Sequence, residues 1–109
     1  MHGSVAIARD LIAIPSVNPM GAPLSGDIYS ERNVASYVDQ FLKKLTVDSK
    51  ITGRDPAHPN VIGYLDVHSR ETLLLEAHMD TVSHENMVIE PFEPTVRDSL
   101  LYETLSVTM

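Results

Sequence analysis

The sequence predicts an α/β domain in which helices pack on a mixed sheet. Apolar residues recur at helical spacing before Pro15 and again between Ser30 and Leu45. Two short apolar segments further along the chain are bounded by polar clusters, which is typical of strands. The chain has 109 residues, 43% hydrophobic and 21% charged, so length and composition fit one globular domain better than a disordered or collagen-like chain.

The first element that we expect is a helix over residues 4–14. Its apolar residues have helical spacing, and Arg9 and Asp10 fall on the outward face. Ser4 is a suitable N-cap, and Pro15 ends the helix because it lacks an N–H donor. Residues 16–29 contain two prolines and two glycines, which predicts a loop that crosses the surface.

The clearest prediction is a second helix from Ser30 to Leu45. Ser30 is a suitable N-cap, Glu31 suits the positive N-terminal end, and two lysines occupy the last turn. Such a helix needs an apolar surface to cover its inward face, so we expect a sheet nearby. The residues that line this face are Val34, Tyr37, Val38, Phe41, Leu42 and Leu45.

Strands are predicted over residues 60–65 and 72–77, joined by the short polar link 66–71 as a hairpin. The leucine run 73–75 has no polar alternation, which predicts a strand that is covered on both faces. A last hairpin is expected over residues 95–102.

Residues 79–94 show neither helical nor strand periodicity. Long irregular segments inside a compact domain are usually functional. This one follows the carboxyl end of the predicted buried strand, where open α/β sheets bind their ligands. We therefore expect the functional site at the start of this segment.

His78 and Asp80 are the candidate site residues there. They are two positions apart at the predicted strand end, so both side chains can point to the same side. A neutral imidazole is a good ligand for zinc or cobalt, and a carboxylate often orients such a ligand through its other ring nitrogen. A surface histidine beside an unrelated aspartate has the same spacing, so the motif alone leaves both interpretations open.

Other residues carry weaker signals. We expect the remaining histidines in turns or solvated loops, and the sequence contains no second ligand set with convincing spacing. It also contains neither a phosphate-binding glycine motif nor the G-x-S-x-G motif of serine hydrolases.

Composition narrows the partners and the compartment. The net charge of −7 lies entirely in residues 51–109, which disfavours nucleic acid as a partner. There is no apolar run near the roughly 18 residues of a membrane span, and the N-terminus does not resemble a secretory signal. The chain has no cysteine, which excludes thiolate ligands and fits a reducing cytoplasm. We expect a cytoplasmic protein without a membrane partner.

Several separated motifs, in the same order, resemble the metal-dependent aminoacylase and exopeptidase family. Members of this family include acetylornithine deacetylase, succinyl-diaminopimelate desuccinylase and glutamate carboxypeptidase. The resemblance covers almost the whole chain. The motifs are LIAIPSVNPMG (11–21), the helix over 31–45, PNVIGYL (59–65), LLLEAHMDTV (73–82) and IEPFEPTVRDSLLY (89–102).

The resemblance implies a zinc-dependent hydrolase of amide bonds in N-acyl amino acids or peptides. Family members hold two zinc ions, or cobalt, in a catalytic α/β domain, and a smaller inserted domain often supports homodimerisation. By this resemblance His78 is a ligand of one metal, and Asp80 is the active-site carboxylate that orients it. Residues 1–109 then correspond to the N-terminal part of the catalytic domain, without the inserted domain and the C-terminal part.

The chain departs from the family pattern after Tyr102. Family members continue there with a Gly-Arg-Gly-Ser-x-Asp-Met motif, whereas this chain reads ETLSVTM and has Thr108 where the metal-bridging aspartate is expected. A hydroxyl cannot replace a carboxylate shared by two dications, and one histidine cannot hold zinc. We therefore expect an incomplete domain that alone neither binds zinc tightly nor hydrolyses amides. The alternatives are a non-catalytic binding or regulatory module derived from this family, and a small α/β domain without activity.

Overall fold

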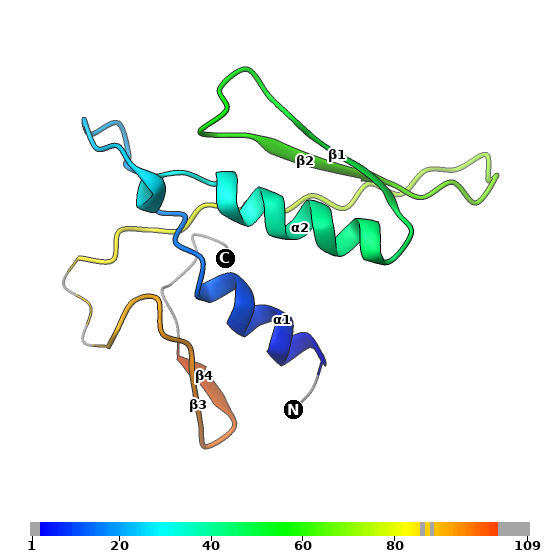
Figure 1. The fold of residues 1–109 in the computed structure, drawn as a ribbon. Coiled ribbons are helices and arrows are strands. Elements are labelled where there is room, and N and C mark those ends of the chain that lie inside the picture. The colour runs from blue at the N-terminus through cyan, green and yellow to red at the C-terminus, as the bar shows by residue number, and fades with distance from the viewer. Residues whose placement is uncertain (1–2, 86, 88, 103–109) are drawn as a thin grey trace.

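The computed structural model describes residues 3–85, 87 and 89–102 as a small mixed helix and strand domain (Figure 1). Its strands form two small antiparallel sheets, β1–β2 and β3–β4, which agrees with a general α/β class. The elements in chain order are α1 (Gly3–Ile12), the 3-10 turn η1 (Asp27–Tyr29), α2 (Arg32–Lys44), β1 (Asp48–Thr52), β2 (Asn60–Tyr64), β3 (Thr95–Arg97) and β4 (Leu100–Tyr102).

Helix α2 confirms the clearest sequence prediction. It begins at Arg32, and Glu31 takes the N-cap position that was expected for Ser30. The Ser30 hydroxyl still accepts a hydrogen bond from the Arg32 N–H at 3.1 Å, so it satisfies one of the first donors of the helix. On the predicted apolar face Val34 is buried, and Tyr37, Val38, Phe41 and Leu42 are half-buried. Leu45 follows the helix as its C-cap and is exposed.

The β1–β2 hairpin lies against α2 and supplies the surface that this helix needs (Figure 1). Strand β1 was not predicted, because DSKIT contains a single apolar residue. It is anchored instead by Ser49, whose buried hydroxyl donates to the Asp39 carboxylate at 2.7 Å. In β2, Gly63 allows the close approach of α2, since a Cβ atom there would lie 2.9 Å from Leu42 Cδ1.

Helix α1 is also confirmed, although Ser4 lies inside it and not at its N-cap. The phenolic O–H of Tyr37 on α2 donates to the Asp10 carboxylate at 2.9 Å and joins the two helices. The hydrogen bond and the negative charge of Asp10 raise the pKa of Tyr37, because both favour the protonated phenol.

The predicted strand over residues 72–77 does not form, and this is the main error of the sequence analysis. Strand β2 pairs with β1, so the expected hairpin through 66–71 is absent from the described part of the chain. Instead of being covered on both faces, Leu73, Leu74 and Leu75 are 82%, 79% and 85% exposed. An apolar run predicts a buried strand only where other strands flank it, and none of the described strands does so.

Of two further predictions about the strands, the last hairpin is confirmed and the mixed sheet is wrong. The hairpin over 95–102 forms, with Val96 opposite Leu101 and a turn in which Asp98 and Ser99 have positive φ. The expected mixed sheet does not form among the described residues, where both sheets are antiparallel and parallel pairing is limited to the bridge between Val17 and Thr81.

The loop over residues 16–29 was expected at the surface, and at its start this is wrong. Ser16 and Val17 are almost fully buried, with 3% and 2% of their surface exposed. They are buried because they lie beside residues 79–81. Among the described residues, no helix has the length and apolar character needed to cross a bilayer.

Candidate functional site

Two segments far apart in the sequence form the frame of the candidate site. The Thr81 N–H donates to the Ser16 carbonyl at 2.9 Å, and the Asn18 N–H donates to the Thr81 carbonyl at 2.8 Å. The Ser16 hydroxyl adds a bond to the Met79 carbonyl at 2.8 Å. These three bonds fix the backbone on both sides of Asp80.

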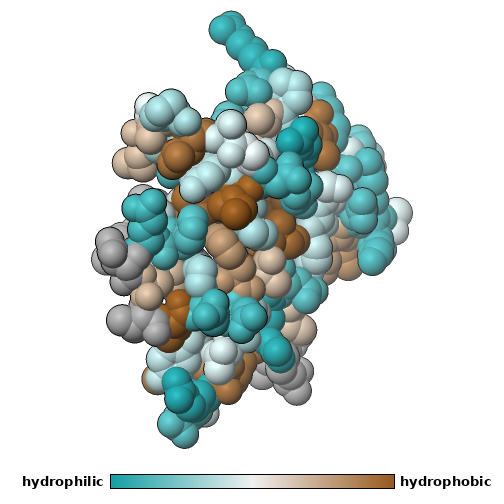
Figure 2. Space-filling view, turned by 60° about the vertical axis from the view of Figure 1, so that its left-hand side comes forward, coloured by the Kyte–Doolittle hydropathy of each residue, from teal (hydrophilic) through white to brown (hydrophobic). Residues whose placement is uncertain are grey.

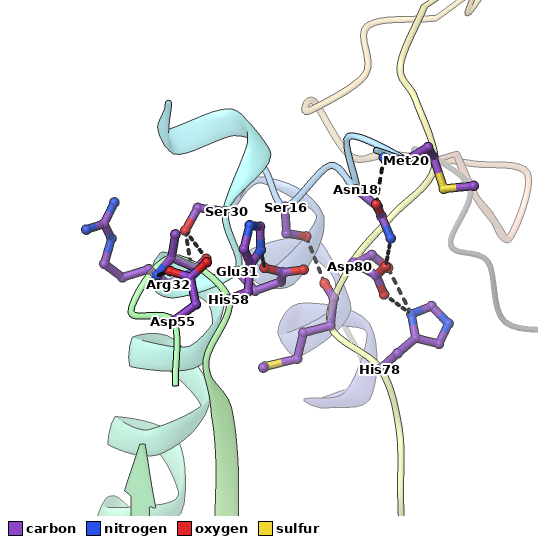
Figure 3. A network of polar contacts seen from close by, with 12 residues as sticks. Ser16, Asn18, Met20, Ser30, Glu31, Arg32, Asp55, His58, His78 and Asp80 are labelled. Atoms are coloured by element: carbon purple, nitrogen blue, oxygen red, sulfur yellow. Dashed lines mark hydrogen bonds and ion pairs between the residues drawn. The ribbon is translucent and has the colours of Figure 1, made fainter. Parts of the chain in front are cut away.

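The frame places His78, Asp80 and Asn18 in one hydrogen-bonded row (Figure 3). His78 Nδ1 lies 2.9 Å from Asp80 Oδ1 and 2.9 Å from the Asp80 carbonyl oxygen. The other carboxylate oxygen of Asp80 accepts from Asn18 Nδ2 at 2.7 Å. The two residues singled out from the sequence are therefore in direct contact.

The amide of Asn18 has a defined orientation. Its oxygen accepts from the Met20 N–H at 2.8 Å, which directs its NH2 group toward Asp80. An oxygen in that place would repel the carboxylate, so the hydrogen-bond partners settle which way the amide points. Sequence reasoning did not select Asn18, because its role depends on a contact with a residue 62 positions away.

This arrangement determines the tautomer of His78. Both oxygens near Nδ1 are acceptors, so in the neutral ring the proton lies on Nδ1 and Nε2 carries the lone pair. A metal-binding histidine with a carboxylate behind it has this arrangement. The side chains of His78 and Asp80 are 34% and 22% exposed, so solvent and ligands can reach the pair.

An apolar cavity of about 410 Å³ adjoins His78. On the face of the molecule that Figure 2 shows, apolar side chains gather at the centre and hydrophilic side chains surround them. The cavity lies between α1 and α2, and its wall also includes Ile14, Val61 of β2, residues 77–79, Thr81 and Phe92. The Thr81 hydroxyl oxygen is buried and has no hydrogen-bond partner within the described part of the chain.

The described residues do not form a complete metal site. Among residues 3–85, 87 and 89–102, no three histidine, aspartate or glutamate side chains converge in a way that could hold a metal ion. The pair supplies one imidazole, whereas zinc takes three or four protein ligands. Thr108, which the sequence analysis aligned with the bridging aspartate, lies outside the described residues.

The other histidines differ in their surroundings. The Nδ1 atom of His58 lies 2.6 Å from the Glu31 carboxylate, and this hydrogen bond raises the pKa of His58 above its ordinary value. His68 is exposed, as expected. His84 was expected in solvent, but its ring packs on Phe92 with the centroids 5.4 Å apart and its Nδ1 atom is buried.

Comparison with known proteins gives no match: no family model, no curated protein and no solved structure is similar to this chain.

Proposed function

We propose that this chain contains the N-terminal part of the catalytic domain of a zinc- or cobalt-dependent hydrolase that cleaves amide bonds in N-acyl amino acids or peptides. The observation that carries the proposal is the row His78–Asp80–Asn18, in which a carboxylate held by an amide fixes the imidazole tautomer. The order of the sequence motifs gives independent support.

In this proposal His78 is a metal ligand and Asp80 is a positioning residue that acts through it. Asp80 accepts the Nδ1–H proton, which makes Nε2 a stronger electron-pair donor and holds the ring in one orientation. Asn18 keeps the second oxygen of the carboxylate in place. The metal, when it is bound with the further ligands that it requires, supplies Lewis acidity and an activated water.

A zinc titration of the 109-residue chain tests the proposed ligand. Imidazole nitrogen shifts, recorded by NMR during the addition of zinc chloride, should change first at Nε2 of His78. We expect weak binding, because the described residues supply a single ligand at this place. His78→Gln should abolish the response there.

The other histidines provide the matched controls. His68 is exposed and lies 3.6 Å from a carboxylate, so it represents an ordinary surface imidazole. His58 has its own carboxylate partner, and His58→Gln should leave the response of His78 unchanged. A response confined to His58 or His68 would refute the role proposed for His78.

The alternative function is a non-catalytic binding module derived from the same family. The apolar cavity favours it, because a volume of about 410 Å³ lies within the range of small-molecule sites. An apolar fluorescent probe should then bind to the wild-type chain, and Ala8→Leu, which extends a side chain into the cavity, should weaken that binding. Probe binding that is unchanged by Ala8→Leu would argue against a binding module built on this cavity.

A further inference from the structure

Ser16 holds both of the peptide groups that flank Asp80. Its hydroxyl donates to the Met79 carbonyl at 2.8 Å, which restrains the peptide group before Asp80 (Figure 3). Its backbone carbonyl accepts from the Thr81 N–H at 2.9 Å, which restrains the peptide group after Asp80. One residue, distant in the sequence, therefore controls the backbone on both sides of the carboxylate.

Ser16 is itself held firmly in place. It is 3% exposed, and its neighbour Val17 is 2% exposed. The Val17 N–H donates to the Ile28 carbonyl at 2.7 Å, and Val17 also forms the parallel bridge with Thr81. Because the Ser16 hydroxyl is shielded from water, no solvent competes for its hydrogen bond, and losing it leaves the Met79 carbonyl short of a donor.

The orientation of the two peptide groups determines where the acceptors for His78 lie. Each peptide group moves as one rigid plane, so turning the plane that contains the Met79 carbonyl changes the φ angle of Asp80 and the direction of its side chain. The Asp80 carbonyl belongs to the following plane. His78 Nδ1 lies 2.9 Å from the carboxylate oxygen and 2.9 Å from this carbonyl oxygen, so both contacts depend on the two planes.

From this geometry we propose that Ser16 is a positioning residue, whose hydroxyl holds Asp80 in the orientation that directs both of its acceptors to His78 Nδ1. Ser16 and Asn18 act on different parts of Asp80, because Asn18 holds the carboxylate and Ser16 holds the backbone. The purpose of this arrangement rests on the proposed function, in which His78 is a metal ligand. The proton position that it controls is measurable without metal.

Ser16→Ala removes the hydroxyl and keeps the backbone bond to Thr81. We expect the ratio of the Nε2–H to the Nδ1–H form of neutral His78 to rise, by up to about fivefold, the factor that one lost hydrogen bond gives. Imidazole nitrogen chemical shifts measure this ratio. Ser16→Cys retains a side chain of similar shape with a weaker donor, so it should give a smaller change in the same direction. It keeps the test decisive if the alanine variant does not fold.

Ser49→Ala is the matched control, because Ser49 is also a buried serine, and its hydroxyl donates to Asp39 on α2. It should lower the stability of the chain and leave the tautomer ratio of His78 unchanged. An equal change in Ser49→Ala and Ser16→Ala would show that the ratio follows a general loss of stability, and would overturn the proposal. A wild-type ratio in both Ser16 variants would overturn it as well.

A titration with zinc chloride separates this inference from the proposed function. In Ser16→Ala the zinc concentration that gives half of the response at Nε2 of His78 should be severalfold higher than in the wild type, because the ring is less well oriented. If the wild type shows no response while Ser16→Ala changes the tautomer ratio, the ligand role of His78 fails and the positioning role of Ser16 holds. If the wild type responds while neither Ser16 variant changes the ratio, the positioning role fails and the ligand role holds.

Discussion

At the scale of single residues, the candidate site depends on a carboxylate with two different partners. One carboxylate oxygen of Asp80 contacts His78 and the other accepts from Asn18. These two contacts fix the orientation of both the carboxylate and the imidazole. The pair thereby differs from an ordinary surface histidine such as His68, whose Nδ1 lies 3.6 Å from a carboxylate.

Asp80→Ala should therefore change the tautomer of His78. In the wild-type chain we expect the Nδ1–H form. In the variant the share of the Nε2–H form should rise, while the backbone carbonyl at position 80, 2.9 Å from Nδ1, still holds part of the Nδ1–H form. Nitrogen chemical shifts of the neutral imidazole measure the ratio. Asn18→Ala should give an intermediate ratio, and His68 serves as the internal reference. An unchanged tautomer in Asp80→Ala would contradict the role of the carboxylate.

His58→Gln should lower stability in a pH-dependent manner. Because Glu31 raises the pKa of His58 in the folded chain, folding gains free energy from the protonated imidazole. This gain is complete below the ordinary histidine pKa of about 6.5 and is lost as pH rises through the raised value. Urea denaturation should thus show a difference between wild type and variant near pH 5.5 that disappears near pH 9.

A difference that appears near pH 9 and disappears near pH 5.5 would show that the His58–Glu31 pair does not stabilise the fold through a protonated imidazole. His68→Gln is the appropriate control, because His68 is exposed and its Nδ1 lies 3.6 Å from the Asp66 carboxylate. We expect its unfolding free energy to follow that of the wild type at both pH values.

At the scale of elements, the packing of α2 on the β1–β2 hairpin depends on the close approach of Leu42 to Gly63. Gly63→Ala places a methyl group 2.9 Å from Leu42 Cδ1, so the leucine must shift. We expect a loss of about 1 kcal/mol in the free energy of unfolding, at the low end for overpacking because a flexible side chain yields. Gly3→Ala, which has nothing within 4 Å, is the control and should not lower the free energy of unfolding in urea denaturation, because alanine has the higher helix propensity.

The Ser49–Asp39 contact is the second device that holds these elements together. Lys43 and Ser49 both hydrogen-bond the Asp39 carboxylate and lower its pKa. Ser49→Ala should cost about 1–2 kcal/mol, because it removes a buried bond and leaves an acceptor short of a partner. The measurement is urea denaturation at neutral pH. Ser36→Ala, which removes an exposed bond to Gln40, should cost less.

The helices and the last hairpin were predictable because local signals define them. The period of the apolar residues places α1 and α2, and Asp98-Ser99 marks the turn of the hairpin. Strand β1 was missed because its stability comes from contacts with α2 and not from its own composition. Residues 72–77 were assigned to a covered strand because an apolar run does not reveal whether a neighbour is present.

The site was predictable in part for the same reason. The spacing of His78 and Asp80 predicted that their side chains could point to the same side, and they are in contact. The strand that was expected to end just before them does not form in the described chain. Their metal-binding roles stay predictions. Asn18 and the buried start of the loop over 16–29 depend on long-range pairing, which no local pattern contains.

At the scale of the whole molecule, apolar surface is covered unevenly. The buried apolar residues among those described are Val17, Val34 and Ala35, while the leucines of 73–75 are open to solvent and a cavity lies between the two helices. A small domain with so little fully buried apolar surface has limited stability. Filling the cavity should therefore increase it.

Ala8→Leu extends a side chain from α1 into this cavity. Leucine has nearly the helix propensity of alanine, so the change acts through packing. We expect a gain of about 1 kcal/mol in the free energy of unfolding, measured by thermal and urea denaturation. Gln40→Leu, at an exposed helical position away from the cavity and between residues of similar helix propensity, is the control. An equal gain in both variants would show that the cavity does not contribute.

The bridge between Val17 and Thr81 has a consequence for the order in which parts of the chain fold. It closes a loop that contains α2 and the β1–β2 hairpin, so the ends of this loop can meet only at an entropic cost that local elements do not bear. The hydrogen bond between Asn18 and Asp80 can form only with that closure, because the two residues are 62 positions apart. The side-chain amide signal of Asn18 during refolding therefore reports a late step, and a helix signal from α2 should precede it.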